Sequence, residues 1–238
     1  MLVAWAVCIA AIVLFQFLIG GKRQQLDATR IARRHDLHLQ RKAQHALTGV
    51  MIFAASGFFP VYADVVVLFG CALAFYLVHG LRKRSKRVDE LYLSCFHGLL
   101  RREEIDRAVL PGAFYFLVGC GLVLALFPTD IARLAILHLS VGDPSASLIG
   151  SLYGRTRVLS GGKSLEGFVG CVIASVTTSF FMLAQQNTDT TAIVVLKAVF
   201  AGICAAVAEC MHLGWDDNLT LPVMSAVLLV AGRTVGAV

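Results

Sequence analysis

The first residues that could do chemistry are basic ones at the start of an apolar block. Arg41, Lys42 and His45 stand together, and the spacing of four between Arg41 and His45 places both on one face of a helix. An arginine fork and a lysine charge suit phosphate oxygens. Basic residues also flank many membrane helices, so this pattern alone indicates either a phosphate site or an ordinary membrane boundary.

A carboxylate on a face of small residues forms the second cluster. Asp143, Ser147, Gly150 and Gly154 follow at spacings that keep them on one helical face. An aspartate at membrane depth costs roughly 2.5–3.5 kcal/mol, so we expect Asp143 to have a function. Magnesium is usually held by one or two carboxylates together with substrate phosphates. The alternative is a helix-packing face in which Asp143 is a cap.

A glycine-rich turn with a lysine forms the third cluster. Gly162, Lys163 and Ser164 open a helix, where unpaired backbone N–H groups and the helix dipole favour phosphate. The spacing is not that of a P-loop, and no strand is predicted before it. Glu166 is a candidate metal ligand in the same turn, and helix capping by Ser164 or Glu166 is the alternative.

Two adjacent carboxylates, Asp216 and Asp217, precede the last apolar block. Adjacent acids in a basic protein suggest metal coordination or removal of a proton from an alcohol. Glu209 is a further candidate, because it is close in sequence and ends the preceding apolar block. The alternative is capping of the next helix by Asp217 or Asn218.

Long apolar blocks must position these clusters. Of the 238 residues, 58% are hydrophobic and 15% are charged. A soluble domain has about 45–50% apolar residues and about 25% charged residues. The blocks approach the roughly 20 residues that cross a bilayer. We therefore predict an all-α, polytopic transmembrane bundle of about eight helices, with one amphipathic interfacial helix over residues 88–107. The block at residues 131–141 is short, so its helix should continue through Asp143.

Basic residues predict the orientation of the bundle. With the N-terminus outside and eight crossings, 18 of the 21 lysines and arginines fall on the cytoplasmic side, together with all four clusters. We divide the chain into an anchor helix and basic cytoplasmic linker, residues 1–40, and a catalytic membrane domain, residues 41–238. The net charge of +6 fits loops facing an anionic leaflet and argues against nucleic-acid binding.

Cations, a glycine turn and carboxylates on one membrane face suit phosphoryl or nucleotidyl transfer, where catalysis is mostly positioning and charge neutralisation. The chain also resembles the CTP-dependent lipid kinases, which include CTP-using diacylglycerol kinases, dolichol kinases and phytol kinases and are related to the phosphatidate cytidylyltransferases. The resemblance extends over about residues 40–225. Its motifs are Arg41-Lys42-x-x-His45, Gly142-Asp143-x-x-Ala146-x-x-x-Gly150-x-x-x-Gly154, Lys163-Ser164-x-Glu166-Gly167 and Asp216-Asp217-Asn218-x-Thr220-x-Pro222.

The resemblance implies transfer of the γ-phosphate of CTP to a lipid hydroxyl, with a divalent metal (Mg or Ca), in the endoplasmic reticulum membrane. It implies that Asp143 holds the metal, with Asp216 or Asp217 as further ligands. Gly150 would lie in the nucleotide site. The partners would be a nucleotide and a membrane lipid, and one carboxylate or His45 would orient or deprotonate the lipid hydroxyl.

The resemblance also implies roles for the basic residues. Arg41 and Lys42 would contact phosphates of the nucleotide. Lys163 would neutralise phosphate charge during transfer. These residues, with Asp143, His45 and Asp217, make up the predicted active site.

The acceptor is predicted to be diacylglycerol, giving phosphatidate, because residues 214–223 are most similar to the diacylglycerol kinases. The Gly142-Asp143 pair is shared with dolichol and phytol kinases and with cytidylyltransferases, so these activities are the alternatives. A non-enzymatic transporter or scaffold is a third alternative. Transporters favour polar sites at the midplane and repeated halves, and the sequence has neither feature.

Overall fold

The computed structural model describes residues 39–96, 99–107, 109–157, 162–185 and 189–236. The predicted anchor helix and almost all of the basic linker lie outside these residues. Within the described ranges the regular structure is entirely helical and contains no strand, which confirms the predicted all-α class. The predicted count of about eight membrane crossings includes the first apolar block, so that count stays a prediction.

In the part of the chain that the structure describes, three helices are long and apolar enough to cross a membrane: α4 (Val61–Arg84), α10 (Leu165–Ala184) and α11 (Thr191–Cys210). The apolar helix α7 (Gly112–Leu126) is shorter. Large apolar side chains on these helices point outward, as expected for contact with lipid rather than water. These features identify an integral membrane protein.

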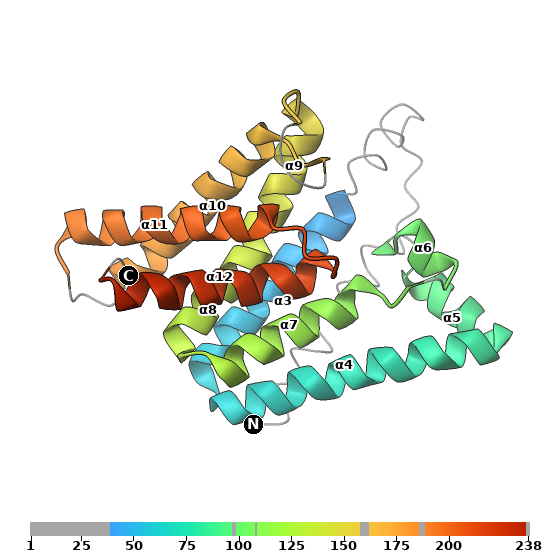
Figure 1. Ribbon diagram of the computed structural model, residues 1–238. Coiled ribbons are helices and arrows are strands. Elements are labelled where there is room, and N and C mark those ends of the chain that lie inside the picture. Colours follow the sequence, from blue (N-terminus) through green and yellow to red (C-terminus); the bar gives the residue numbers. More distant parts are fainter. Residues whose placement is uncertain (1–38, 97–98, 108, 158–161, 186–188, 237–238) are drawn as a thin grey trace.

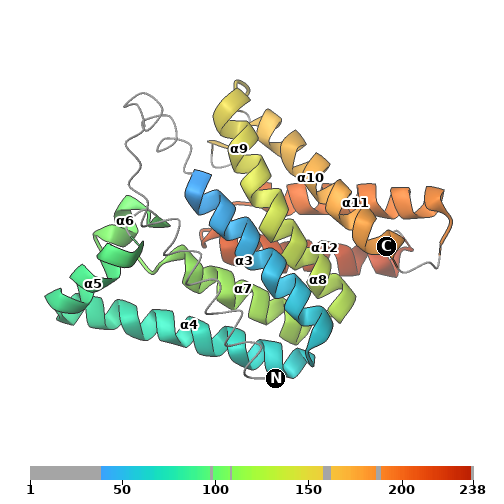
Figure 2. The ribbon, with the colours of Figure 1, turned by 180° about the vertical axis from the view of Figure 1, so that it is seen from behind.

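The chain passes back and forth between two sides of the bundle. Figures 1 and 2 show that helix ends far apart in sequence lie toward one side of the bundle, and these helix ends carry the polar clusters. This side contains the beginnings of α3 (Leu39–Phe58), α7, α10 and α12 (Asp217–Thr234), and the ends of α4 and α11. The alternating direction of the helices therefore brings four distant stretches to one place.

The helix that carries Asp143 is interrupted by a wide turn. Helix α8 (Thr129–Leu137) continues through a π-helical turn (His138–Gly142) into α9 (Asp143–Tyr153). Proline lacks an N–H donor and its ring clashes with the carbonyl four residues earlier, so Pro144 is the physical reason for the widening. The predicted continuation through Asp143 is confirmed. The capping alternative is wrong, because Asp143 lies inside a continuous helix.

The interfacial segment differs from its prediction. A single amphipathic helix over residues 88–107 was expected, but the chain forms α5 (Lys86–Phe96) and the short helix α6 (Arg102–Ile105). The cause is Arg82, which is fully buried at the end of α4. Its guanidinium lies 2.9 Å from Asp89 of α5 and 3.3 Å from the carbonyl oxygen of Glu104 in α6. A single straight helix over residues 88–107 could not bring both Asp89 and Glu104 to Arg82.

Close contact between α3 and the π-helical turn fixes the position of the first basic cluster. Gly49 of α3 faces Ser140, and a Cβ at position 49 would lie only 1.7 Å from the Ser140 hydroxyl oxygen. The absence of a side chain therefore permits this approach. Nearby, the ring of His138 lies between the hydroxyls of Ser179 and Ser225, at 2.9 and 2.7 Å, which ties the turn to α10 and α12.

Candidate active site

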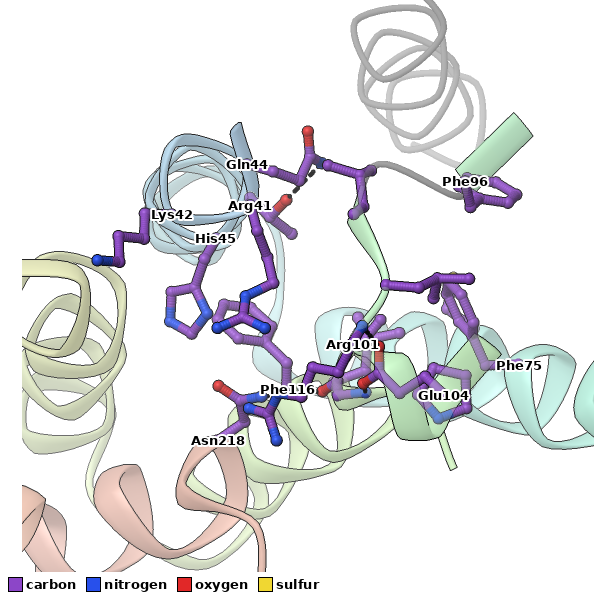
Figure 3. A pocket seen from close by; sticks show the side chains of 18 of the residues that line it. Arg41, Lys42, Gln44, His45, Phe75, Phe96, Arg101, Glu104, Phe116 and Asn218 are labelled. Carbon is purple, nitrogen blue, oxygen red and sulfur yellow. Dashed lines mark hydrogen bonds between the residues drawn. The ribbon is translucent and has the colours of Figure 1, made fainter. Parts of the chain in front are cut away.

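A cavity of about 250 Å³ lies between α3, α4, α7 and the chain around α5 and α6. Figure 3 shows charged side chains from α3 and from residue 101 pointing into it. Its polar end is lined by Arg41, Lys42, His45, Arg101, Asp143 and Asn218. Its apolar part is lined by Ile52, Val67, Leu68, Cys71, Phe75, Phe96, Leu99, Leu100, Phe116 and Leu117. The cavity thus combines anion-binding groups with a hydrocarbon-like wall.

The first turns of α3 present the predicted cations to the cavity. Arg41 and Lys42 both line it, and Lys42 Nζ lies 3.5 Å from the hydroxyl oxygen of Ser151 in α9. Among the described residues, the guanidinium of Arg41 has no hydrogen-bond or ion-pair partner. Arg101 lines the same polar end, so two arginines and a lysine lie around one space. Such an arrangement is favourable when an anion occupies that space.

His45 and Asp143 meet at the same end of the cavity. Nε2 of His45 lies 2.9 Å from the carbonyl oxygen of Leu139 and 3.7 Å from Oδ2 of Asp143. A carbonyl only accepts hydrogen bonds, so we assign the ring proton of neutral His45 to Nε2. Its Nδ1 is then the basic nitrogen. The ring also packs edge-on against Phe116, with 4.7 Å between centroids, which holds it in place.

Lys163 joins the loop before α10 to the end of α11 and the beginning of α12. Its Nζ lies 3.0 Å from Oε1 of Glu209 and 3.2 Å from Oδ2 of Asp217, and it also donates to the Glu209 carbonyl. Burial alone would lower the pKa of Lys163, but the two carboxylates outweigh burial and raise it above its ordinary value. Lys163 therefore stays protonated, and Glu209 belongs to the cluster, as its sequence position suggested.

Asp216 and Arg101 connect the interfacial segment to α12. Oδ1 of Asp216 accepts a hydrogen bond from the backbone N–H of Asn218 at 3.0 Å, and Oδ2 accepts one from Arg101 at 3.2 Å. Asp216 is therefore the cap of α12, and the predicted cap at Asp217 or Asn218 is wrong. Arg101 lies within residues 88–107, for which the sequence predicts only an amphipathic interfacial helix. Its position directly after an apolar interfacial stretch was the only available signal.

Glu104 holds Arg101 in place and was also missed. Its carboxylate accepts hydrogen bonds from the backbone N–H of Arg101 at 2.8 Å and of Gly112 at 2.6 Å. Glu104 is only 4% exposed, so these are strong, buried contacts that fix α6 against the start of α7. Asn218 completes the link by donating to the Gly112 carbonyl at 3.2 Å. Nothing local in the sequence predicts this network.

Two of the predicted glycine residues, Gly150 and Gly154, make close packing contacts. A Cβ at Gly150 would lie 3.0 Å from the Ser164 hydroxyl, and one at Gly154 would lie 2.3 Å from the Gly150 carbonyl oxygen. Ser164 caps α10 by accepting a hydrogen bond from Gly167 N at 3.1 Å. Gly162 has a φ of +75°, which favours glycine. Nucleotide binding by these residues stays a prediction.

The candidate metal ligands do not form a single preformed cage. Asp143 faces His45, Asp217 pairs with Lys163, and Glu166 accepts hydrogen bonds from Thr156 N at 3.2 and 3.3 Å. Across the described ranges, no group of three or more His, Cys, Asp or Glu side chains is close enough to hold a metal. One carboxylate with substrate phosphates suffices for magnesium, and Asp143, partly exposed at the cavity, fits that role.

Comparison with known proteins supports a kinase family. The chain is 28% identical over 209 residues to CTP-dependent diacylglycerol kinase 1 of Schizosaccharomyces pombe, covering 83% of this chain and 94% of that protein. It is 29% identical over 171 residues to the protein of the same name in Eremothecium gossypii, covering 64% of this chain and 53% of that protein. A phytol kinase of Synechocystis is 32% identical over 127 residues, covering 51% of this chain and 54% of that protein.

The coverage of these relatives differs. The chain spans nearly all of the Schizosaccharomyces diacylglycerol kinase but about half the length of the Eremothecium and Synechocystis proteins. A dolichol kinase of Schizosaccharomyces pombe is 24% identical across 95% of this chain and 46% of its own length. No protein-family profile and no solved structure matches the chain. The chain is thus similar to lipid kinases of three kinds, the CTP-dependent diacylglycerol kinases, a dolichol kinase and a phytol kinase.

Proposed function

We propose that this protein transfers the γ-phosphate of CTP to the hydroxyl of a membrane lipid, with diacylglycerol as acceptor and phosphatidate as product. The observation that carries the proposal is the cavity, in which cations from α3 and Arg101 lie at one end and apolar side chains at the other. A phosphate tail requires the first kind of surface and a lipid alcohol the second. The relatives named as CTP-dependent diacylglycerol kinases support the donor and the acceptor.

The basic residues bind and neutralise the phosphate tail. In phosphoryl transfer there is little covalent work for the protein, so charge neutralisation and alignment supply most of the rate enhancement. Arg41 and Lys42 line the cavity from α3, and Arg101 lines it from the position directly before α6. Lys163 lies at the neighbouring helix ends, where its raised pKa keeps it cationic. Gly150, Gly154, Gly162 and Ser164 shape the loop beside it.

Asp143 is the residue that would hold a divalent metal, Mg or Ca, together with phosphate oxygens. Such a metal supplies positive charge at the phosphates and aligns them for in-line transfer. Asp216, the cap of α12, and Asp217, the first residue of α12, are further candidates, each with a basic partner, Arg101 or Lys163. Glu166 is bound to the Thr156 backbone and would need to leave it to act as a ligand.

His45 takes the proton of the lipid hydroxyl. Its Nε2 is committed to the Leu139 carbonyl, which leaves Nδ1 as the basic nitrogen. The lipid oxygen forms a bond to the γ-phosphorus while the bond from that phosphorus to the β–γ bridging oxygen breaks, and CDP leaves. The hydroxyl proton passes to Nδ1. The resulting imidazolium lies 3.7 Å from the Asp143 carboxylate, which stabilises it.

We place the protein in the endoplasmic reticulum membrane with the active site facing the cytoplasm, because most basic residues then lie on that side. Residues 1–40 would form an anchor and linker, and residues 41–238 the catalytic domain. The metal, the compartment and a role in phospholipid synthesis are parts of this proposal. The membrane itself follows from the three spanning helices.

A polyprenol or phytol kinase is the second candidate. It is supported by the dolichol kinase and phytol kinase among the relatives, and by the Gly142-Asp143 pair that this chain has before α9. The apolar wall of the cavity suits any of these alcohols, because hydrocarbon chains differ little in the surface that they require. The donor chemistry is the same for both candidates.

The test uses purified protein in lipid–detergent micelles with CTP labelled at the γ-phosphate. Dioleoylglycerol, dolichol, phytol and phosphatidate are supplied separately, and ATP replaces CTP in a parallel series. A CTP-dependent lipid kinase transfers the label to lipid. A cytidylyltransferase, which uses phosphatidate, releases the label as pyrophosphate. If no alcohol acquires label and CTP is not consumed, the proposed function is wrong and the transporter or scaffold alternative gains support.

A further inference from the structure

The apolar half of the cavity offers no charged side chain to the phosphates of a nucleotide. Val67, Cys71 and Phe75 of α4 are spaced four residues apart and face the cavity opposite Phe116 of α7. They are only partly buried, so they border open space rather than fill the core. Val66, directly before Val67, is 68% exposed on the outer surface of the same helix. Helix α4 therefore has two apolar faces, one toward the bilayer and one toward the cavity.

We propose that this cavity is the binding site of the lipid acceptor. The hydroxyl lies at the polar end beside His45 and Asp143, and the first part of the apolar chain lies against Val67, Cys71 and Phe75. This inference rests on the proposed lipid-kinase function and deepens it, because it names where the acceptor binds. Because the cavity has a polar end and an apolar wall, it sets the orientation of the lipid. Only one orientation places the hydroxyl among charged groups and the chain among apolar ones.

The size of the cavity limits how much of the lipid it holds. Its volume of about 250 Å³ is below the range of roughly 300–1,000 Å³ that encloses a drug-sized ligand. It therefore accommodates the hydroxyl-bearing end and the beginning of a chain, while the remaining chain stays in the bilayer. The buried side chains of Ile52 and Leu68 close the space at its apolar side.

The energetics follow from the membrane environment. A lipid chain that moves from the bilayer into an apolar cavity gains little hydrophobic free energy, because lipid tails are as apolar as leucine. Selectivity must then come from shape near the hydroxyl and from polar contacts at the charged end. We infer that bulk close to the hydroxyl decides which alcohol is accepted, and that distant chain length has little effect.

A pair of tryptophan substitutions on α4 tests the site. Val67→Trp fills the apolar half, and Val66→Trp adds the same bulk on the outer face one residue away. In the γ-labelled CTP assay, Val67→Trp should raise the KM for dioleoylglycerol about tenfold, because the indole occupies space that the lipid needs; a tenfold change corresponds to about 1.4 kcal/mol of binding free energy. The KM for CTP should stay within about twofold, and Val66→Trp should match the wild type in both.

A second measurement on the unmodified protein covers the case in which Val67→Trp does not fold. Cys71 is a free thiol in the cavity wall. Its modification by N-ethylmaleimide is followed by mass spectrometry in micelles with and without dioleoylglycerol. Bound lipid should slow the modification of Cys71, CTP should leave it unchanged, and Cys95 outside the cavity should react at the same rate in all samples.

The outcomes separate the two proposals. If the wild type phosphorylates no alcohol but lipid protects Cys71, the proposed function fails and the lipid site stands. If the wild type is an active lipid kinase, while Val67→Trp keeps its lipid KM or Cys71 reacts equally fast with and without lipid, the acceptor site is not this cavity.

Discussion

Nε2 of His45 lies 3.7 Å from Oδ2 of Asp143, which joins the beginning of α3 to the first residue of α9, directly after the π-helical turn. The contact depends on Gly49, where the two helices approach most closely, and on the widened turn that precedes Pro144. A π-helical turn within an α-helix is often found at a functional site, because it redirects the side chains around it. Here it directs Asp143 toward the cavity that also contains Arg41 and Arg101.

The Asp143→Asn variant should lose about 10²–10³-fold in kcat, because the amide neither carries the charge that holds a metal nor stabilises protonated His45. In titrations with Mg²⁺ or Ca²⁺ the half-saturating concentration should rise at least tenfold. The matched control is Asp189→Asn, since Asp189 is also partly exposed and paired with a basic residue, Lys197. Full activity of correctly inserted Asp143→Asn protein would contradict the assignment.

Replacing His45 by Gln should lower kcat about 100-fold, because the variant has no group that takes the hydroxyl proton. The KM for CTP should change little, since the phosphates are bound by the neighbouring cations. His212→Gln is the control, because His212 is exposed and does not line the cavity. Equal kcat values for His45→Gln and the wild type would assign the proton to another acceptor.

Lys163→Met should reduce both activity and stability. It leaves Glu209, which is 7% exposed, without its cation, and an unpaired buried charge destabilises by about 1–3 kcal/mol when water still has partial access. The double variant Lys163→Met/Glu209→Gln should recover the midpoint of thermal unfolding but not the activity. Recovery of both would show that Lys163 is only structural, and no loss of stability in the single variant would contradict the ion pair.

Arg101→Gln should lower kcat/KM for CTP about 10–100-fold, because a charge-assisted contact to phosphate contributes about 1.5–3 kcal/mol. The matched control is Arg233→Gln. Arg233 has a similarly exposed side chain and pairs with Asp130 at the opposite side of the bundle. Similar activity in both variants would mean that Arg101 serves only to bind Asp216.

Gly49→Ala should destabilise the protein by about 1–3 kcal/mol, because the new methyl group would overlap the side chain of Ser140. Activity should fall as well, since displacement of α3 moves His45 away from Asp143. Gly70→Ala in α4 is the control, because a Cβ there meets nothing within 4 Å and alanine favours a helix. The midpoint of thermal unfolding distinguishes the two variants, and an unchanged value for Gly49→Ala would refute the close packing.

Local features of the sequence were sufficient to predict the long helices and to place some candidate residues on one helical face. The length and composition of the apolar blocks predicted α4, α10 and α11, because crossing a bilayer imposes a minimum hydrophobic length. The short block before Asp143 correctly predicted a helix that continues through it. Spacing also predicted that Arg41 and His45 share a face, and both line the cavity. Helix length, helix continuity and shared helical faces depend on residues that are close in sequence, so the sequence predicts them directly.

Only the tertiary structure decided which distant residues meet. Arg101 reaches Asp216 because buried Arg82 folds the interfacial segment back, which no local periodicity predicts. Lys163 meets both Glu209 and Asp217 because the end of α11 and the beginning of α12 lie beside the loop before α10. The apolar wall of the cavity was not predicted either. Contacts between separate helices depend on their crossing angles and on shape at the contact, and these arise only when all the helices pack together.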